Sequence, residues 1–397
     1  MVDQPEAASS RTDETKAFLT RLWNLENSER PGFLIGNLGG PVTGGTGVRS
    51  ALFSTEGTDT VRDRLLDPEK FLRAQIEEME GLLKLRGDYV PTLCPALGVI
   101  GIPSAFGCEV IWWEKDFPAV RPVIKDDPAQ VRELPTPSVT DGELGRILRY
   151  TEYFVQKTGG RIPIRLADIQ GPLDSAALIF GHNNLLQALY THPADAHLLL
   201  KKVTDLTIRF AQAQRDLVRS LHAEFVPAMF QPWLADGNGI SVSNDECALI
   251  SAVQHDTFSV PYLNEISEAF GGIYIHSCGK WDHQIPSLMK VRNLRGLEFG
   301  ASEAPYAPVL RSFGGATVLA CRVGLHRDIR FRGMADFIRK IRAASPTNRG
   351  LFIHVDITNG IPGEDWPVTD LEEVYRLVES PQDYVKWQKT NIRTSRL

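Results

Sequence analysis

The chain alternates short apolar runs with longer stretches in which apolar residues recur every three or four positions. Short apolar runs bounded by Gly, Pro or polar residues predict buried β-strands, whereas the longer periodic stretches predict helices with one buried face. Eight runs predict strands, at 33–36, 89–93, 162–169, 225–233, 272–278, 296–300, 317–323 and 351–357. Helices are predicted at 61–85, 143–157, 246–270, 334–343 and 371–378, with two or more between 175 and 221.

Eight strands that alternate with helices predict a parallel sheet, and eight such repeats are typical of a single (β/α)8 TIM barrel. We assign the barrel to residues 26–390. The polar, acidic segment 1–25 is predicted to be flexible. Residues 94–141 are rich in Pro and Gly and predict an elaborated loop or small hairpin after the second strand, with a short extended piece at 109–113.

Polar residues stand where the predicted strands end, and active sites of this fold lie at the carboxyl ends of the strands. These residues are Asn37, Cys94, Asp168, Gln170, Trp233, Asp236, His276, Cys278, Glu298, Cys321, His354 and Asp356. We expect Glu298 and Asp168 to act in catalysis. Trp233 and Asp236 are the candidates for cofactor binding.

His276 and Cys278 are the most informative pair, because they lie two residues apart where the strand at 272–278 ends at Gly279. Alternate side chains of a strand point the same way, so the imidazole and the thiol are expected on one side. Zinc takes both ligand types but needs at least one more protein ligand. The alternative interpretation is a buried histidine beside an inert core thiol.

Composition and charge narrow the function. The 397 residues are 43% hydrophobic and 23% charged, as in an ordinary globular protein, and the net charge of −6 argues against nucleic acid as a partner. The five cysteines are widely spaced and odd in number, which argues against a disulfide framework. The polar start has no apolar core like that of a signal peptide, and no apolar run reaches membrane-spanning length. We therefore expect a cytoplasmic protein.

Several stretches resemble the uroporphyrinogen decarboxylase-like superfamily, in particular its cobalamin-dependent methyltransferase branch. They are IQGPLDSAALIFG with the helices that follow it, and ISAVQHDTFSVPYLNEISEAFGGIYIHSCG. The resemblance extends over residues 85–380 and is strongest from Gly171 to Gly279. The decarboxylase branch carries an Arg-rich segment of the form RQAGR near its start. The corresponding region here is glycine-rich with a lone Arg49, so decarboxylation of a tetrapyrrole is not expected.

The resemblance to the methyltransferase branch implies a zinc ion held by His276, Cys278 and a third ligand near the last strand. The family usually has a Cys at that third position, and this chain has none there. His354 falls closest to it and is our predicted third ligand, with Asp356 and Cys321 as alternatives. Glu298 is expected either as a displaceable fourth ligand, as an acceptor for the imidazole, or simply as a salt-bridged carboxylate at the rim. Asp168 is expected to hold a histidine or to bind substrate.

The resemblance further implies that zinc activates a thiol and that cobalamin, carried on a small corrinoid protein, is the co-substrate. We therefore predict a zinc-dependent methyltransferase that moves a methyl group between a corrinoid and a small thiol or methylated substrate. A homodimer is one of the partner arrangements considered. The alternatives are a zinc-dependent lyase, decarboxylase or hydrolase on the same barrel, or a barrel that binds a corrinoid without catalysis.

Overall fold

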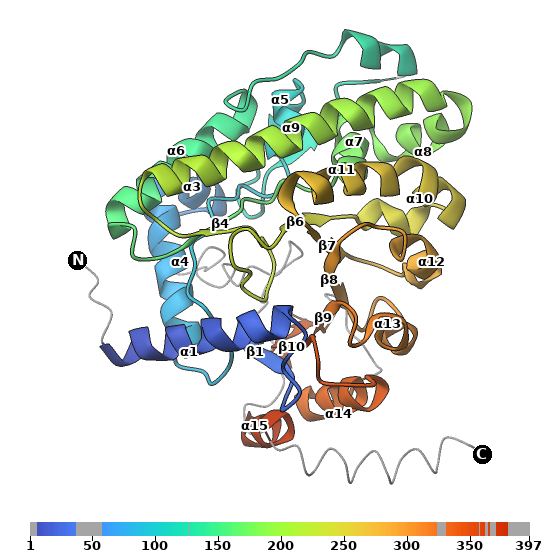
Figure 1. Cartoon of the computed structure of the whole chain (residues 1–397). Helices are drawn as coiled ribbons and strands as arrows, with labels where there is room; N and C mark the ends of the chain where they lie inside the picture. The colour runs from blue at the N-terminus through green and yellow to red at the C-terminus, as the bar shows by residue number, and fades with distance from the viewer. Residues whose placement is uncertain are drawn as a thin grey trace.

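The computed structural model describes residues 6–36, 58–125, 127–323, 331–356, 358–361, 364–365 and 371–379. Their centre is a six-stranded parallel sheet with helices packed around it (Figure 1). In spatial order its strands are β1 (Gly32–Gly36), β10 (Leu351–Asp356), β9 (Val318–Arg322), β8 (Leu294–Gly300), β7 (Ile273–Ser277) and β6 (Ile240–Ser243). The predicted α/β class with a parallel sheet is confirmed.

Two short strands form a second parallel pair, β4 (Ile164–Arg165) with β5 (Phe225–Val226). Backbone hydrogen bonds connect this pair to the two edge strands of the six-stranded sheet, β6 and, through residues 88–93, β1. They run from Leu93 N to Pro163 O (2.9 Å), from Arg165 N to Leu93 O (2.7 Å), from Ser241 N to Pro227 O (3.0 Å), and from Asp88 N to Phe33 O (2.7 Å). The extended segment from Asp88 to Leu93 therefore lies between β1 and β4.

The strand prediction is confirmed for most of the sheet and differs in three places. The predicted strand 89–93 forms only a single bridge at Leu93, while 162–169 and 225–233 shorten to β4 and β5. Strand β6 is not predicted from the sequence. Its Ser241 and Ser243 alternate with apolar residues and are fully buried, so polar residues stand where a buried strand is expected to be apolar.

Helices lie in all the regions where the sequence predicts them. They are α3 (Val61–Leu66), α4 (Pro68–Leu83), α5 (Gly101–Ala105), α6 (Gly142–Thr158), α7 (Pro172–Phe180), α8 (His182–Thr191), α9 (Pro193–Ser220), α10 (Ala252–Phe258), α11 (Val260–Phe270), α12 (Ile285–Leu288), α13 (Tyr306–Phe313), α14 (Met334–Ala344) and α15 (Leu371–Glu379). Three 3-10 turns are η1 (Pro128–Glu133), η2 (Asp245–Leu249) and η3 (Asp282–Gln284). However, α5, α12 and α13 are not predicted from the sequence, and the predicted helix 246–270 is divided among η2, α10 and α11. The predicted helix 61–85 is split in two because Pro68 starts α4, where Asp67 caps the backbone N–H groups of Glu69 and Lys70. No helix in the described ranges is both long and apolar enough to cross a membrane.

Two antiparallel strand pairs and an N-terminal helix lie outside the parallel sheet. The loop after the Leu93 segment carries a hairpin of β2 (Glu109–Ile111) and β3 (Ala119–Arg121), as the sequence predicts. The backbone of β11 (Thr358–Ile361) pairs with that of β12 (Glu364–Asp365) after β10. Residues predicted to be flexible at the start of the chain instead form helix α1 (Glu6–Trp23). Its Leu19, Leu22 and Trp23 are buried, which an isolated polar segment would not allow.

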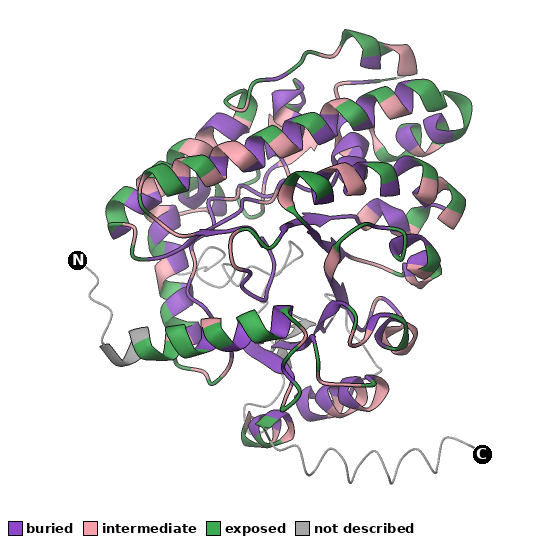
Figure 2. Ribbon diagram, viewed as in Figure 1, coloured by how far each residue is buried: buried purple, intermediate pink, exposed green. Residues whose placement is uncertain are grey.

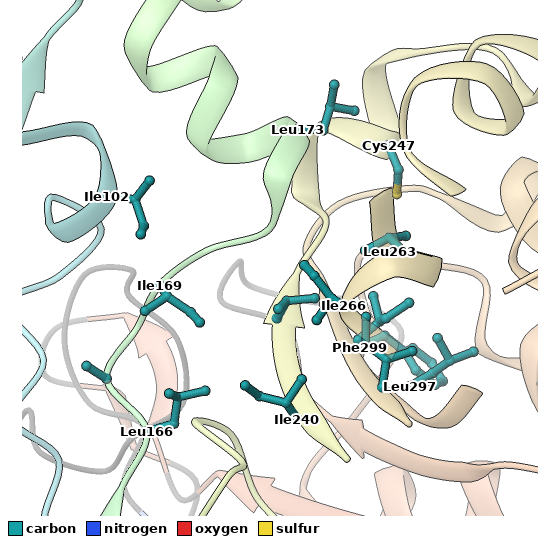
Figure 3. Close-up of a cluster of buried hydrophobic side chains, with 14 of the residues drawn as sticks. Ile102, Leu166, Ile169, Leu173, Ile240, Cys247, Leu263, Ile266, Leu297 and Phe299 are labelled. Atoms are coloured by element: carbon teal, nitrogen blue, oxygen red, sulfur yellow. The ribbon is translucent and has the colours of Figure 1, made fainter. Parts of the chain in front are cut away.

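The apolar core has two layers because successive strand side chains point to opposite faces. Outward residues such as Ile275, Leu297 and Phe299 pack against the helices, and Figure 3 shows Leu297 and Phe299 close to Ile266 of α11. Inward residues form a separate cluster to which α1 contributes. Its members include Leu34, Val226, Tyr274, Val318, Ala320 and Phe352 from the strands, with Phe18, Leu19, Leu22 and Trp23. The strands are buried on both faces, as Figure 2 shows.

The chain between β5 and β6 helps to fill the inward cluster. Figure 1 shows this segment, in yellow-green, looping toward the middle of the molecule. Its Ala228, Met229, Phe230, Trp233 and Leu234 all belong to the inward cluster. The inward face of the sheet is therefore packed with apolar side chains at the amino ends of the strands, next to α1. The polar inward residues lie at the carboxyl ends of the strands.

Candidate metal site at the carboxyl ends of the strands

His276 and Cys278 meet at the carboxyl end of β7. His276 Nε2 lies 3.1 Å from Cys278 Sγ, so the imidazole and thiol do emerge on one side. The ring of His276 is 2% exposed and stacks on Phe230 at a centroid distance of 4.2 Å. Cys278 is partly exposed and follows the last strand residue. The imidazole is thus buried, whereas Cys278 is partly accessible to solvent.

Asp245 supplies the third group in reach. In the described part of the chain, Asp245, His276 and Cys278 form the group whose ligand atoms all lie within 4.8 Å of one another. Asp245 Oδ1 is 3.6 Å from His276 Nε2 and accepts a hydrogen bond of 2.6 Å from the backbone N–H of Cys278. Nitrogen, sulfur and oxygen donors in one cluster are a donor set that zinc accepts, so the residues present fit this metal.

The turn that carries Asp245 is anchored by a buried carboxylate. Asp174, in the first turn of α7, accepts hydrogen bonds from the backbone N–H groups of Asp245 and Glu246, both at 2.9 Å, and from Ser243 Oγ at 2.6 Å. Burial raises the pKa of Asp174 to about 7. A second contact, from Asn244 N to His276 O at 2.8 Å, ties the end of β6 to β7. Asp174 is therefore a positioning residue for Asp245.

Glu298 orients the imidazole from the neighbouring strand β8. It pairs with His276 Nδ1, which leaves Nε2 to face Cys278 and Asp245. A carboxylate on the far nitrogen of a ligating histidine fixes its tautomer and raises its basicity. Burial would raise the pKa of Glu298, but the charges of His276 and Arg322 outweigh it and hold this pKa at about 2. Of the roles expected for Glu298, acceptor for the imidazole is the one that this geometry supports.

Arg322 of β9 completes a buried charge network. Its Nε lies 2.7 Å from Glu298 Oε1, an ion pair by distance whose angle does not make a hydrogen bond. Its Nη2 donates to Cys278 Sγ at 3.5 Å, and Nη1 lies 3.8 Å from Glu303. Glu303 also accepts from the N–H of Gly279 at 3.1 Å. The guanidinium thus links the carboxylate behind His276 to the sulfur of Cys278.

The predicted third ligand, His354, is buried on β10 but lies outside the group of three. Its Nε2 would be 3.5 Å from a Cβ placed at Gly36, so the ring faces the end of β1. Burial lowers the pKa of His354 to about 4, and the charges of Arg322 and Arg165 add to this. Its part in metal binding stays a prediction. The alternative Cys321 belongs to the outward cluster, and the side chain of Asp356 is outside what the structure describes, as is Asn37.

Asp168, which follows β4, lies at the same end. Its Oδ1 accepts from Gln170 N at 3.1 Å and Gln170 Nε2 at 3.0 Å. Burial raises the pKa of Asp168, the charge of His276 lowers it, and that of Asp245 raises it. The charges of His276 and Asp245 thus act on Asp168, and its part in catalysis stays a prediction.

Trp233 and Asp236 are not among the residues of the candidate metal site, and their part in cofactor binding stays a prediction. Trp233 is buried on the side of α1, where its Nε1 donates to Glu224 and its carbonyl accepts from Trp23 Nε1 at 2.8 Å. Asp236 pairs with Arg219 in the last turn of α9. Because β5 ends at Val226, these residues belong to the segment that leads back to the start of β6.

Two residues close to His276 and Cys278, Asp245 and Arg322, are not predicted from the sequence pattern. Asp245 follows the strand β6, which was not predicted, and Arg322 lies next to Cys321 in the run LACRV. The alternating direction of side chains along a strand could have identified Arg322 as an inward-facing residue. Because Cys321 and Leu319 face outward, Arg322 must face inward, toward the same side as Ala320.

Comparison with known proteins agrees with this architecture. The model of the family "Uroporphyrinogen decarboxylase (URO-D)" matches residues 93–219, which confirms the resemblance to the uroporphyrinogen decarboxylase-like superfamily. That match ends before β6 and the candidate metal site. No curated protein shows significant similarity to the chain.

Among solved structures, a methyltransferase from Methanosarcina mazei superposes with a TM-score of 0.62 and 15% sequence identity. The superposition covers 94% of this chain and 99% of the methyltransferase. At this identity the likeness shows a shared fold over nearly the whole length of both chains.

Proposed function

We propose that this protein is a zinc-dependent methyltransferase that moves a methyl group between a corrinoid and a small thiol or methylated substrate. The observation that carries the proposal is the contact of His276 Nε2 with Cys278 Sγ at 3.1 Å, with Asp245 in reach and Glu298 on the far nitrogen. The superfamily match and the fold shared with a methyltransferase support it. The corrinoid, carried on a partner protein, is part of the proposal.

We also propose that the strands close into a barrel. The β4–β5 pair and the Asp88–Leu93 segment bridge β6 and β1 through the backbone hydrogen bonds described above. A closed ring would bring the carboxyl ends of β4, β6, β7 and β8 to one mouth. The electrostatic interaction of Asp168, which follows β4, with His276 and Asp245 agrees with this arrangement.

His276, Cys278 and Asp245 would hold the zinc ion in this proposal. A zinc ion with three protein ligands keeps an open position, where it would lower the pKa of a bound thiol and so make it nucleophilic. Glu298 keeps the proton of His276 on Nδ1, so that Nε2 can bind metal. Arg322 balances the charge of Glu298 and donates to the sulfur of Cys278.

A second candidate function is a zinc-dependent hydrolase or lyase. The observation that favours it is Asp245 as the third group, because an oxygen ligand is harder than the cysteine usual in the methyltransferase branch. Both candidates need the metal. A corrinoid-binding barrel without catalysis does not.

The test is anaerobic methyl transfer from methylcobalamin to thiols of different size, followed in the visible spectrum. We expect demethylation with zinc-loaded protein, loss of activity in Cys278→Ser, and full activity in Cys108→Ser. Cys108 is a matched control because it is buried beside Leu178 O, away from the site. Two negative results together contradict the proposal. Zinc-loaded protein would fail to demethylate methylcobalamin with every thiol tested, and it would fail to methylate cobalt(I) cobalamin from methoxylated or methylamine donors. Zinc content near one per chain would then favour the second candidate.

A further inference from the structure

Arg165 on β4 is buried, and the two terminal nitrogens of its guanidinium have no hydrogen-bond partner in the described part of the chain. The residue is 2% exposed. Its Nε donates to Thr92 Oγ1 at 3.0 Å, whereas Nη1 and Nη2 are buried and make no hydrogen bond within the described ranges. Guanidinium N–H groups are obligatory donors, and a buried donor left unpaired costs about 1–3 kcal/mol, more when it is charged.

The side chain of Arg165 points into the sheet's interior. Its neighbours Ile164 and Leu166 belong to the outward cluster, so alternation directs Arg165 inward. Across the β4–β5 pair it stands opposite Val226, a member of the inward cluster. Arg165 therefore shares the interior with Tyr274, which lies two residues before His276 on β7.

The charge of Arg165 is also uncompensated in the described part of the chain. The titratable groups that act on it are the thiol of Cys94 and the phenols of Tyr89 and Tyr274, and burial lowers its pKa. Arg322 makes the contrast clear, since the carboxylates of Glu298 and Glu303 both face it. An arginine stays protonated in proteins, and a buried charge without a counter-ion is strongly destabilising.

We propose that Arg165 anchors an anionic substrate group, a carboxylate or an oxyanion of similar size, inside the strand ring. The two free N–H groups of a guanidinium match the two oxygens of a carboxylate, and such a bidentate pair supplies both charge and direction. Its charge acts on His354, as does that of Arg322, so the anchor lies within electrostatic range of the charge network behind the metal site. That the anion is part of the substrate rests on the proposed function; that Arg165 binds an anion does not.

The test uses metal-free protein with propionate as the probe and propionamide, its neutral isostere, as the comparison. We expect propionate to bind the wild-type protein at least about tenfold more tightly than propionamide in calorimetric titration. Arg165→Met should weaken propionate binding by about 10- to 100-fold, the range for a charged hydrogen-bonded pair, and leave propionamide unchanged. Arg121→Met is the matched control, because Arg121 pairs with Glu109 on an exposed hairpin.

A second readout separates an anchor from a structural arginine. Removing an uncompensated buried charge should leave the melting temperature of ligand-free Arg165→Met equal to or above that of the wild type. Arg165→Lys keeps the charge but not the fork, and serves if the Met variant does not fold; we expect intermediate affinity. Equal binding of propionate and propionamide by the wild type, or unchanged propionate binding in both Arg165 variants, overturns the inference. Failure of methyl transfer with intact propionate binding would reject the proposed function alone.

Discussion

At the scale of single residues, the two nitrogens of His276 have separate tasks. Nδ1 is held by Glu298, and Nε2 faces Cys278 and Asp245. Glu298 in turn is fixed by Arg322, so the direction of the imidazole depends on residues from three strands. The arrangement can orient a metal ligand before the metal arrives, which lowers the cost of ordering the site on binding.

The identity of the third ligand can be decided by substitution. Asp245→Ala should weaken zinc binding by well over tenfold, because it removes a group within 4.8 Å of both other ligand atoms. His354→Ala should change the affinity much less if Asp245 is the ligand. Zinc dissociation constants from competition with a chromophoric chelator measure both. The reverse order of effects would restore His354, the residue that the family pattern predicts.

Acid sensitivity provides a prediction away from the metal site. His255 is fully buried and its Nε2 contacts the amide of Asn244, and burial lowers the pKa of His255 from 6.5 to about 4. Between these values the unfolded chain binds more protons than the folded one, so the free energy of unfolding falls as the pH drops through this window. The loss attributable to His255 between pH 7 and pH 5 is about 2 kcal/mol.

Replacing His255 by Gln should therefore reduce the difference in unfolding free energy between pH 7 and pH 5 by about that amount. Urea denaturation at the two pH values measures it. The exposed His192→Gln is the control and should leave the pH dependence as in the wild type. An identical pH dependence in the wild type and His255→Gln would show that His255 is not the group that titrates.

At the scale of elements, the end of β6 and the turn η2 decide the position of Asp245. The strand places Ser243 beside His276, and Asp174 from α7 fastens the following turn by its backbone N–H groups. Two elements that are remote in sequence thus hold one ligand. This explains why a short, serine-containing strand with little apolar character is fully buried at this point.

Helix α1 makes a separate prediction, because it covers the amino ends of the strands. Trp23 is 4% exposed, stacks edge-on against Tyr274 and donates to the carbonyl of Trp233. Trp23→Ala should lower the free energy of unfolding by about 3–5 kcal/mol. Trp113→Ala, at a side chain that is 49% exposed, should change it by only about 0.5 kcal/mol. Equal small effects in urea denaturation would mean that α1 does not contribute to the core.

At the scale of the whole molecule, the inward face of the six-stranded sheet carries apolar packing at one end of its strands and polar side chains at the other. Apolar residues, with the segment between β5 and β6 and with α1, fill the side at the amino ends. His276, Glu298, Arg322 and Asp168 gather at the carboxyl ends, supported by the packed layer beneath them. This division agrees with the usual location of active sites in folds of parallel strands.

Metal binding should then be visible in global stability. Zinc bound by Asp245, His276 and Cys278, which only the folded chain brings together, would raise the melting temperature of the wild-type protein. At free zinc about 100 times the dissociation constant the gain is about 2.7 kcal/mol. Thermal unfolding before and after chelation measures it, and Cys278→Ser should show little change. A melting temperature that chelation leaves unaltered in zinc-containing wild-type protein would contradict a folded-state site.

Features that depend on local pattern could be predicted from the sequence. Alternation of apolar and polar runs predicted the parallel α/β sheet and most of its strands, and the i, i+2 spacing of His276 and Cys278 predicted that both side chains face one way. These predictions hold because side-chain direction in a strand follows from backbone geometry alone.

The residues that join this pair from distant parts of the chain could not be predicted in the same way, because their positions depend on the folded structure. Asp245 lies 31 positions before His276 and Arg322 lies 44 positions after Cys278, and their nearness depends on strand order, register and the anchoring by Asp174. The same holds for α1: its polar composition predicts a flexible segment, whereas in the fold one face of the helix packs against the strands. It also holds for Trp233, which packs in the inward cluster because β5 ends at Val226. Contacts between residues far apart in the chain follow from packing, and packing is a property of the assembled fold.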